Sequence, residues 1–244
     1  MIKKLFTLFI CLLSLAMTFT SCSDEAVDVE TVNKQTIFVF FPWTGDTGSS
    51  GLYSELKNNV DSMCAGIVDK KGLTNTRVLV FFTEKYNQST LYDLQYDATT
   101  KTVNRIPIKK YEGNSHCTAE GFADLLNDVR QNAEALNYSL IIGAHGCGWT
   151  YASDWVNYPY KARPKGGSIR KGNDDNTVSN ATSNSFSGIQ FGNDPNKPVT
   201  RFFGSVSQAD NAIDVSTLAE GIKLSGLKMQ YILFDACYMG NVET

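Results

Sequence analysis

Short apolar runs alternate along the chain with segments in which apolar residues recur every three or four positions. The first pattern is typical of buried strands, and the second is typical of helices with one apolar face. The sequence therefore predicts strands at 36–41, 77–83, 140–142 and 231–234, and helices over 52–69, after Thr118 and after Asp214. Turn residues between 91–97 and 103–109 indicate a hairpin.

Strands and helices follow one another in alternation, with the hairpin inserted. This order favours an α/β fold with a mainly parallel sheet flanked by helices. The pattern fails from Tyr151 to Asp210, a stretch rich in Asn, Ser, Gly and Asp without sustained periodicity. Because such a long stretch within a domain is usually functional or disordered, we interpret 151–210 as a flexible loop.

The first 21 residues differ in character from the rest of the chain. Lys3 and Lys4 precede an apolar run that reaches Met17, and small residues then lead to Cys22. A basic start, a short apolar run and small residues are the pattern of a secretory signal peptide. We expect a signal at 1–21, a polar tether at 22–34 and one folded domain over 35–244.

The junction at Cys22 also resembles the lipobox of bacterial lipoproteins, in which the cysteine takes the lipid. The acidic residues directly after it resemble the start of lipoproteins exported to the surface of some Gram-negative bacteria. These features predict a lipoprotein of the outer membrane, attached through Cys22 and exposed at the surface. The alternative is a plain secretory signal in which Cys22 is incidental.

Charge and cysteine content exclude some classes of function. The 22 basic residues fall to 20 without the signal lysines, against 25 acidic residues, so the mature net charge is −5. With no basic stripe or nucleic-acid motif, a nucleic-acid partner is not expected. Cys64, Cys117, Cys147 and Cys237 are too scattered for a disulfide scaffold, and a free thiol in an oxidising compartment invites a catalytic explanation.

Two strand ends carry reactive side chains. One apolar run leads into Gly143-Ala144-His145-Gly146, and the other leads into Asp235-Ala236-Cys237. In open α/β sheets, ligands bind beyond the carboxyl ends of the strands, so His145 and Cys237 can meet in one cleft. An imidazole beside a thiol is the minimal machinery of a cysteine nucleophile. The second histidine, His116, is expected in an exposed loop.

These two blocks, His145 to Trp149 and Phe234 to Met239, together with Glu243, resemble the clostripain-like cysteine peptidases. That family belongs to the clan of caspases, legumains and gingipains. The resemblance implies a caspase-like fold and cleavage of peptide bonds after Arg or Lys. It also implies that the substrates are proteins or peptides with a basic P1 residue.

The resemblance assigns a role to each residue of the blocks. Cys237 would be the nucleophile, His145 its base, and the backbone N–H groups of Gly146 and Cys237 the oxyanion donors. Asp235 would bind the basic P1 side chain, which a carboxylate favours electrostatically. A bland interpretation also exists, in which the thiol is a small buried hydrophobe and Asp235 caps a following helix.

The long loop contains basic residues that such a peptidase would recognise. Self-processing is therefore expected within 151–210, after Lys161, Arg163 or Lys165, unless these are ordinary charges of a solvated loop. The chemistry requires no cofactor, although Asp174-Asp175 and Asp194 offer carboxylates that Ca²⁺ could use. Cys147 is interpreted as structural, or as a disulfide partner of Cys117.

A bare sheet edge is hazardous, and the last predicted strand ends close to Thr244, so we expect the natural protein to extend further. The alternative is that a second chain completes the sheet. The first functional hypothesis is an endopeptidase that cuts after basic residues. The second is an inactive surface lipoprotein that keeps the fold and binds peptides or protein partners. The third is a hydrolase that acts on something other than peptides.

Overall fold

The computed structural model describes residues 32–45, 51–146, 150–151, 199–205, 209–237 and 239. The chain divides into two compact units, Met1–Val32 and Asn33–Thr244. All the helices and strands named below belong to the second unit. The predicted signal peptide and Cys22 lie outside the described residues.

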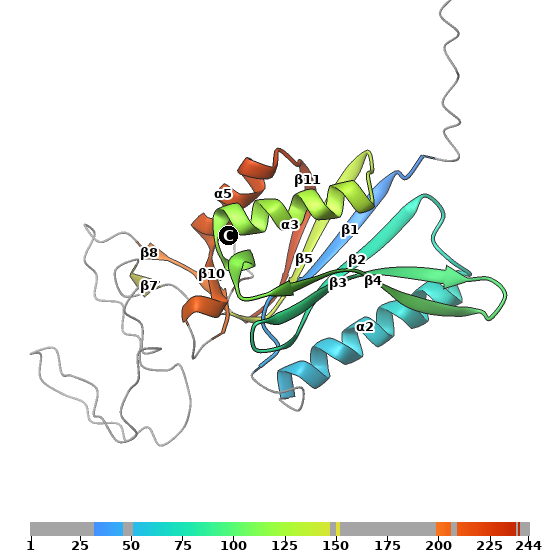
Figure 1. Cartoon of the computed structure of the whole chain (residues 1–244), viewed down its shortest axis with the longest axis horizontal. Coiled ribbons are helices and arrows are strands. Elements are labelled where there is room, and N and C mark those ends of the chain that lie inside the picture. Colours follow the sequence, from blue (N-terminus) through green and yellow to red (C-terminus); the bar gives the residue numbers. More distant parts are fainter. Residues whose placement is uncertain are drawn as a thin grey trace, which may run out of the picture. The chain divides into compact units, whose positions relative to one another are not determined.

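A six-stranded sheet forms the centre of the second unit (Figure 1). In spatial order its strands are β11 (Met229–Asp235), β5 (Asn137–Gly143), β1 (Gln35–Phe41), β2 (Thr76–Lys85), β3 (Gln88–Asp97) and β4 (Thr102–Glu112). Pairing is parallel from β11 to β2 and antiparallel from β2 to β4. The predicted fold, a mainly parallel sheet with an inserted hairpin, is confirmed.

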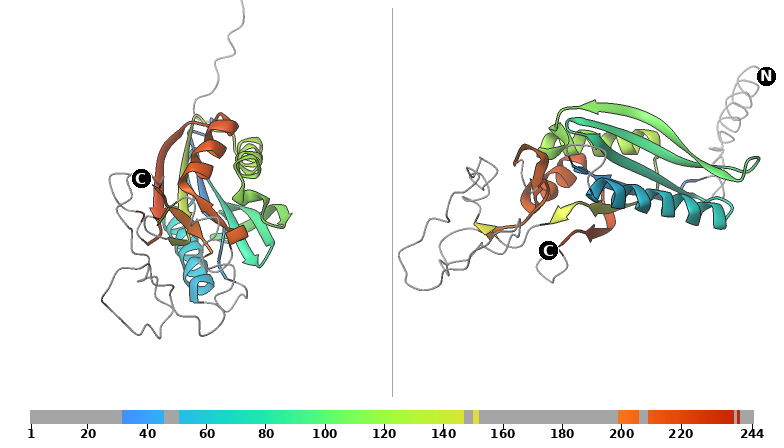
Figure 2. Two further views of the ribbon diagram at one scale, coloured as in Figure 1. Left: turned by 90° about the vertical axis from the view of Figure 1, so that its left-hand side faces the viewer. Right: turned by 90° about the horizontal axis from the view of Figure 1, so that it is seen from below.

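Helices cover both faces of the sheet (Figure 2). The long helix α2 (Gly51–Asp69) lies on one face, and α3 (Ala119–Asn132) and α5 (Val215–Ser225) lie on the other. The predicted caps are in place, because the side chains of Thr118 and Asp214 accept hydrogen bonds from the first turns of α3 and α5. Among the described helices, none is both long and apolar enough to cross a bilayer.

Successive side chains of a strand point to opposite faces, so each strand contributes to two cores. In β1, Phe38 and Phe40 pack toward α3 and α5, whereas Val39 and Phe41 pack toward α2. All four side chains are almost fully buried. This two-sided burial explains why the parallel strands read as continuous apolar runs in the sequence.

The outer strand β11 is less protected than the other parallel strands. It pairs with β5 alone among the described strands. Tyr231, Ile232 and Leu233 are 42%, 41% and 52% exposed, whereas Leu140 and Ile142 of β5 are buried. Three consecutive apolar side chains are therefore exposed on this strand, so both faces of the sheet are open to solvent at β11.

Short strands and turns near the ends of the sheet were not predicted. A second sheet contains β6 (His145–Gly146), β9 (Phe202–Gly204) and β10 (Ala212–Asp214), and β7 (Thr150–Tyr151) pairs with β8 (Val199–Thr200). The single-turn helices η2 (Ser115–Cys117) and η3 (Ala209–Asn211) complete the elements. Strands of two or three residues are too short for a periodic pattern, so sequence reasoning placed part of them in the loop 151–210.

The expectation for His116 was wrong. Its side chain is only 3% exposed and lies against the rings of Phe40 and Phe81. Neither ring nitrogen makes a hydrogen bond of normal geometry with a described residue. Burial lowers the pKa of His116 to about 4 and outweighs the opposite effect of the Pro42 carbonyl.

This buried imidazole should make the stability of the fold depend on pH. Between about pH 6.5 and pH 4 the unfolded state binds a proton that the folded state does not, so stability should fall on acidification. The loss should reach about 3 kcal/mol once the pH is below 4. Urea unfolding measured across this range would show it, and His116→Phe should flatten the acid slope. An unchanged slope in His116→Phe would assign the acid sensitivity to other groups.

Candidate active site

The two predicted strand ends meet at one edge of the sheet. β5 and β11 are parallel neighbours, and their register places Asp235 opposite Gly143. Just beyond this pair, the Ala144 N–H donates a hydrogen bond to the Asp235 carbonyl, with 3.4 Å between nitrogen and oxygen. The pairing of β5 with β11 thus brings the segments that contain His145 and Cys237 to the same end of the sheet, as the sequence predicted.

A second set of contacts holds the His145 segment in position. His145 and Gly146 form β6, which pairs with β9 so that Gly146 lies opposite Phe203. The Phe203 side chain is fully buried and meets the ring of Phe234 edge-on, with 5.9 Å between the ring centroids. Aromatic packing therefore ties β6 and β9 to the strand that precedes Cys237.

Gly146 lies directly against the backbone of Cys237. A Cβ atom built at Gly146 would lie 2.0 Å from the Cys237 carbonyl oxygen and 3.0 Å from the Cys237 nitrogen. Only glycine fits such an approach of two backbones. The observation brings the His145-Gly146 block into contact with the Cys237 backbone, so the two residues proposed as nucleophile and base lie on adjoining segments.

The two reactive side chains are both accessible. Cys237 is an exposed free thiol, and the His145 side chain is also exposed to solvent. Partial desolvation nevertheless lowers the pKa of His145. A pKa below the ordinary value of 6.5 leaves the imidazole neutral at pH 7, so it can accept a proton. The described structure has no hydrogen bond between the two side chains. Catalytic hydrogen bonds are often long in free enzymes and shorten when substrate binds.

Asp235 ends β11 with its side chain exposed. Its carboxylate accepts a hydrogen bond from the Asn59 side-chain amide on α2, with 3.4 Å between nitrogen and oxygen. Sequence reasoning missed Asn59, because nothing local to α2 signals a partner on β11. The alternative role of Asp235 as a helix cap concerns a segment that begins after Cys237 and lies largely outside the described residues.

Several predicted residues cannot be placed. Outside the described residues lie Cys22, Cys147, Lys161, Arg163 and Lys165, together with the acidic residues considered for Ca²⁺. Cys117 is a free thiol, and burial raises its pKa to about 12. Within the part of the chain that the structure describes, no group of three His, Cys, Asp or Glu side chains could hold a metal ion.

Comparison with solved structures identifies similar molecules. The secreted C11 cysteine protease iotapain from Bacteroides thetaiotaomicron has 27% sequence identity and a TM-score of 0.63, covering 87% of this chain and 48% of its own. C11 proteases are the clostripain-like cysteine proteases, so the chain is clostripain-like. No family model and no curated protein matches the sequence.

A second solved structure agrees on the fold of this clostripain-like chain. It is a secreted C11 cysteine protease from Bacteroides thetaiotaomicron in complex with an irreversible peptide inhibitor. Its identity is 18% and its TM-score 0.53, over 86% of this chain and 44% of its own. The clostripain-like chain therefore spans about half the length of each of these two solved structures.

The contact between Gly146 and Cys237 predicts a local effect of substitution. Gly146→Ala should displace the Cys237 backbone, because its methyl group would overlap the carbonyl oxygen. We expect the alkylation rate of the Cys237 thiol by iodoacetamide, and its pH dependence, to change. Mass spectrometry of the labelled protein measures both.

Gly66→Ala is the matched control, because a Cβ at Gly66 meets no atom within 4 Å. That substitution lies inside α2 and should leave thiol reactivity unchanged while stabilising the helix by up to about 1 kcal/mol. Identical labelling of Gly146→Ala and the unmodified chain would contradict the close approach.

Proposed function

We propose that this chain carries the catalytic cysteine and histidine of a cysteine endopeptidase that cleaves after Arg or Lys. The observation that carries the proposal is the contact of Gly146 with the Cys237 backbone, which brings the segments of two exposed reactive residues, His145 and Cys237, side by side. The likeness to iotapain, a secreted cysteine protease, supports the same reaction class. The likeness covers 48% of the iotapain chain, so the proposal concerns the part of the machinery that lies here.

The proposed reaction uses two groups that face one edge of the sheet. The Cys237 sulfur attacks the carbonyl carbon of the scissile peptide bond, and His145 takes the thiol proton. The N–H groups of Gly146 and Cys237 stabilise the oxyanion. His145 then gives the proton to the leaving amine, and water hydrolyses the thioester. A lowered His145 pKa suits this role, because the base form predominates at pH 7.

Asp235 is the proposed specificity residue. Its carboxylate lies two residues before the nucleophile and is exposed, so an incoming guanidinium or ammonium group can reach it. Asn59 donates to one of its oxygens and leaves the other available. A charge-assisted hydrogen bond to a basic P1 side chain would then distinguish Arg and Lys from neutral residues.

The proposal extends to location and activation. We propose export and attachment to the outer membrane through lipid on Cys22, and the secreted nature of iotapain agrees with an extracytoplasmic site. We also propose self-processing in 151–210 at Lys161, Arg163 or Lys165, because basic residues there would suit the site. Ca²⁺ binding through acidic residues of this segment is a further part of the proposal.

Labelling tests the nucleophile directly. A peptide ending in an arginyl acyloxymethyl ketone should add once to the purified chain, and peptide mapping should locate the adduct on Cys237. Cys237→Ala should give no adduct, and Cys64→Ala, which removes a thiol on α2, should label normally. Labelling of Cys64 or Cys117 in place of Cys237 would contradict the assignment.

The purified unmodified chain and Cys237→Ala also test self-processing. Conversion to two fragments with new ends within 151–210 is expected for the unmodified chain and should be absent from Cys237→Ala. N-terminal sequencing gives the cut sites. Fragments that persist in Cys237→Ala would assign the cleavage to another protease. A chain that binds peptide substrates without adduct or fragments would fit the inactive surface lipoprotein.

Asp235→Asn tests specificity, because it keeps the shape of the side chain and removes its charge. The labelling rate with an arginyl electrophile should fall roughly ten- to a hundredfold, as expected for a lost charged hydrogen bond. The rate with a norleucyl electrophile should change little. Asp124→Asn, an exposed acid on α3, serves as the control and should change neither rate. Equal losses for both electrophiles would show that Asp235 supports the fold instead.

A further inference from the structure

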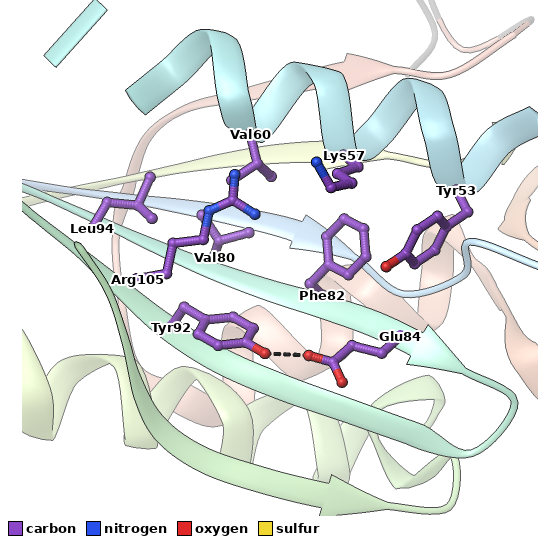
Figure 3. Close-up of a pocket in the computed structure, with 9 residues that line it drawn as sticks. All are labelled: Tyr53, Lys57, Val60, Val80, Phe82, Glu84, Tyr92, Leu94 and Arg105. Carbon is purple, nitrogen blue, oxygen red and sulfur yellow. Dashed lines mark hydrogen bonds between the residues drawn. The ribbon is translucent and has the colours of Figure 1, made fainter. Parts of the chain in front are cut away.

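A cavity lies away from the candidate active site, between α2 and the hairpin side of the sheet (Figure 3). It is lined from β2, β3 and β4, whereas His145 and Cys237 follow β5 and β11. Its apolar lining comes from Val60, Val80, Phe82 and Leu94. Nothing in the proposed peptidase reaction uses these side chains.

The volume of the cavity suits one aromatic ring. Its volume is about 130 Å³. For comparison, an apolar protein cavity of about 150 Å³ accepts benzene. Tyr53 and Tyr92 add aromatic walls, so a flat ring would meet apolar or aromatic surface from both α2 and the sheet.

The polar groups of the cavity are separated by charge. Figure 3 shows the charged ends of Lys57 and Arg105 near Val60, and the Glu84 carboxylate on the other side, where Tyr92 donates a hydrogen bond to it. The carboxylate of Glu84 therefore already has a partner. The cationic side is the one that offers unused hydrogen-bond donors to a ligand.

Two cations share one carboxylate at this side. Lys57 pairs with Asp61 at 2.8 Å between nitrogen and oxygen, and Arg105 pairs with the other oxygen of the same residue. The trio of Lys57, Arg105 and Asp61 thus carries one net positive charge, while the Glu84 carboxylate lies on the other side of the cavity. The side chains of Lys57 and Arg105 are 49% and 36% exposed, and exposed ion pairs contribute little to stability, so both can turn toward a ligand at small cost.

We propose that this cavity binds an aryl carboxylate, a single aromatic ring separated by two or three bonds from a carboxylate group. The ring occupies the apolar space between Val80 and Val60, and the carboxylate accepts hydrogen bonds from Arg105 and Lys57. The ligand carboxylate gives Lys57 and Arg105 a second anionic partner beside Asp61, on the side of the cavity away from Glu84. The same chemistry occurs in a free aromatic acid and in the C-terminal phenylalanine of a peptide.

The experiment measures binding of 3-phenylpropionate to the purified chain by calorimetry and by NMR, with 3-phenylpropanamide as the uncharged counterpart. Saturable binding of the acid is expected at millimolar concentrations, with at least about tenfold weaker binding of the amide because the charged hydrogen bonds are lost. Arg105→Gln and Lys57→Gln should each weaken binding of the acid by a similar factor. Shifts of the Phe82 and Tyr92 ring signals should locate the ligand.

Lys109→Gln is the matched control. Lys109 also lies on β4 and pairs with an acid, Asp128, at 2.6 Å, but it does not line the cavity. This variant should bind the acid as the unmodified chain does. N-acetylglycyl-phenylalanine and its C-terminal amide then distinguish the two sources. Binding of the free peptide acid assigns peptide C-termini to the site, and binding of 3-phenylpropionate alone assigns small aromatic acids.

Three outcomes would overturn the proposal. The first is absence of saturable binding for both acids at millimolar concentrations. The second is equal binding of acid and amide, because the cations would then contribute nothing. The third is unchanged binding in Arg105→Gln and Lys57→Gln with normal circular dichroism spectra. Since Cys237 labelling does not involve this cavity, none of these results bears on the peptidase proposal.

Discussion

The parallel pairing of β5 with β11 is the constraint on which the candidate site depends. β5 also pairs with β1, so the His145 strand is held from both sides within the sheet. Register between the strands then decides which residues emerge together at their ends. Asp235 lies opposite Gly143, and the turn beyond each of these residues brings Gly146 onto the Cys237 backbone.

Burial on both faces of the sheet allows one framework to support several separate chemical environments. On the α2 side of the sheet, Asn59 donates a hydrogen bond to Asp235, and the cavity beside Arg105 lies between α2 and the hairpin strands. The opposite face contains the aromatic cluster in which His116 is buried. Because protein interiors are tightly packed, each environment depends on the shape of the sheet that separates them.

The long elements could be predicted because their signals are local. Thr118 and Asp214 cap helices where the sequence indicated, and the strands before His145 and Cys237 occur as expected. Those signals are a cap residue, a helical period or an apolar run. Each is contained within a few neighbouring residues, so tertiary contacts were not needed to interpret it.

The features that were missed depend on residues far apart in the chain. His116 follows Asn114 and Ser115, which indicate a turn, but its burial comes from Phe40 and Phe81. The short strand β9 is defined by Phe203, whose packing against Phe234 no local pattern reveals. The roles of His145, Cys237 and Asp235 remain predictions that the geometry permits.

The exposed edge of β11 has a consequence for how long the two reactive groups stay together. Among the described strands, β11 has one neighbour and three consecutive exposed apolar side chains, whereas β5 has two neighbours and its Leu140 and Ile142 side chains are buried. Strands with few contacts open locally at lower free energy than the centre of a sheet. The Cys237 thiol therefore follows the strand that opens more easily, β11. The His145 imidazole follows the more stable strand, β5. Any surface that covers this edge would lengthen the lifetime of the assembled pair without touching either group.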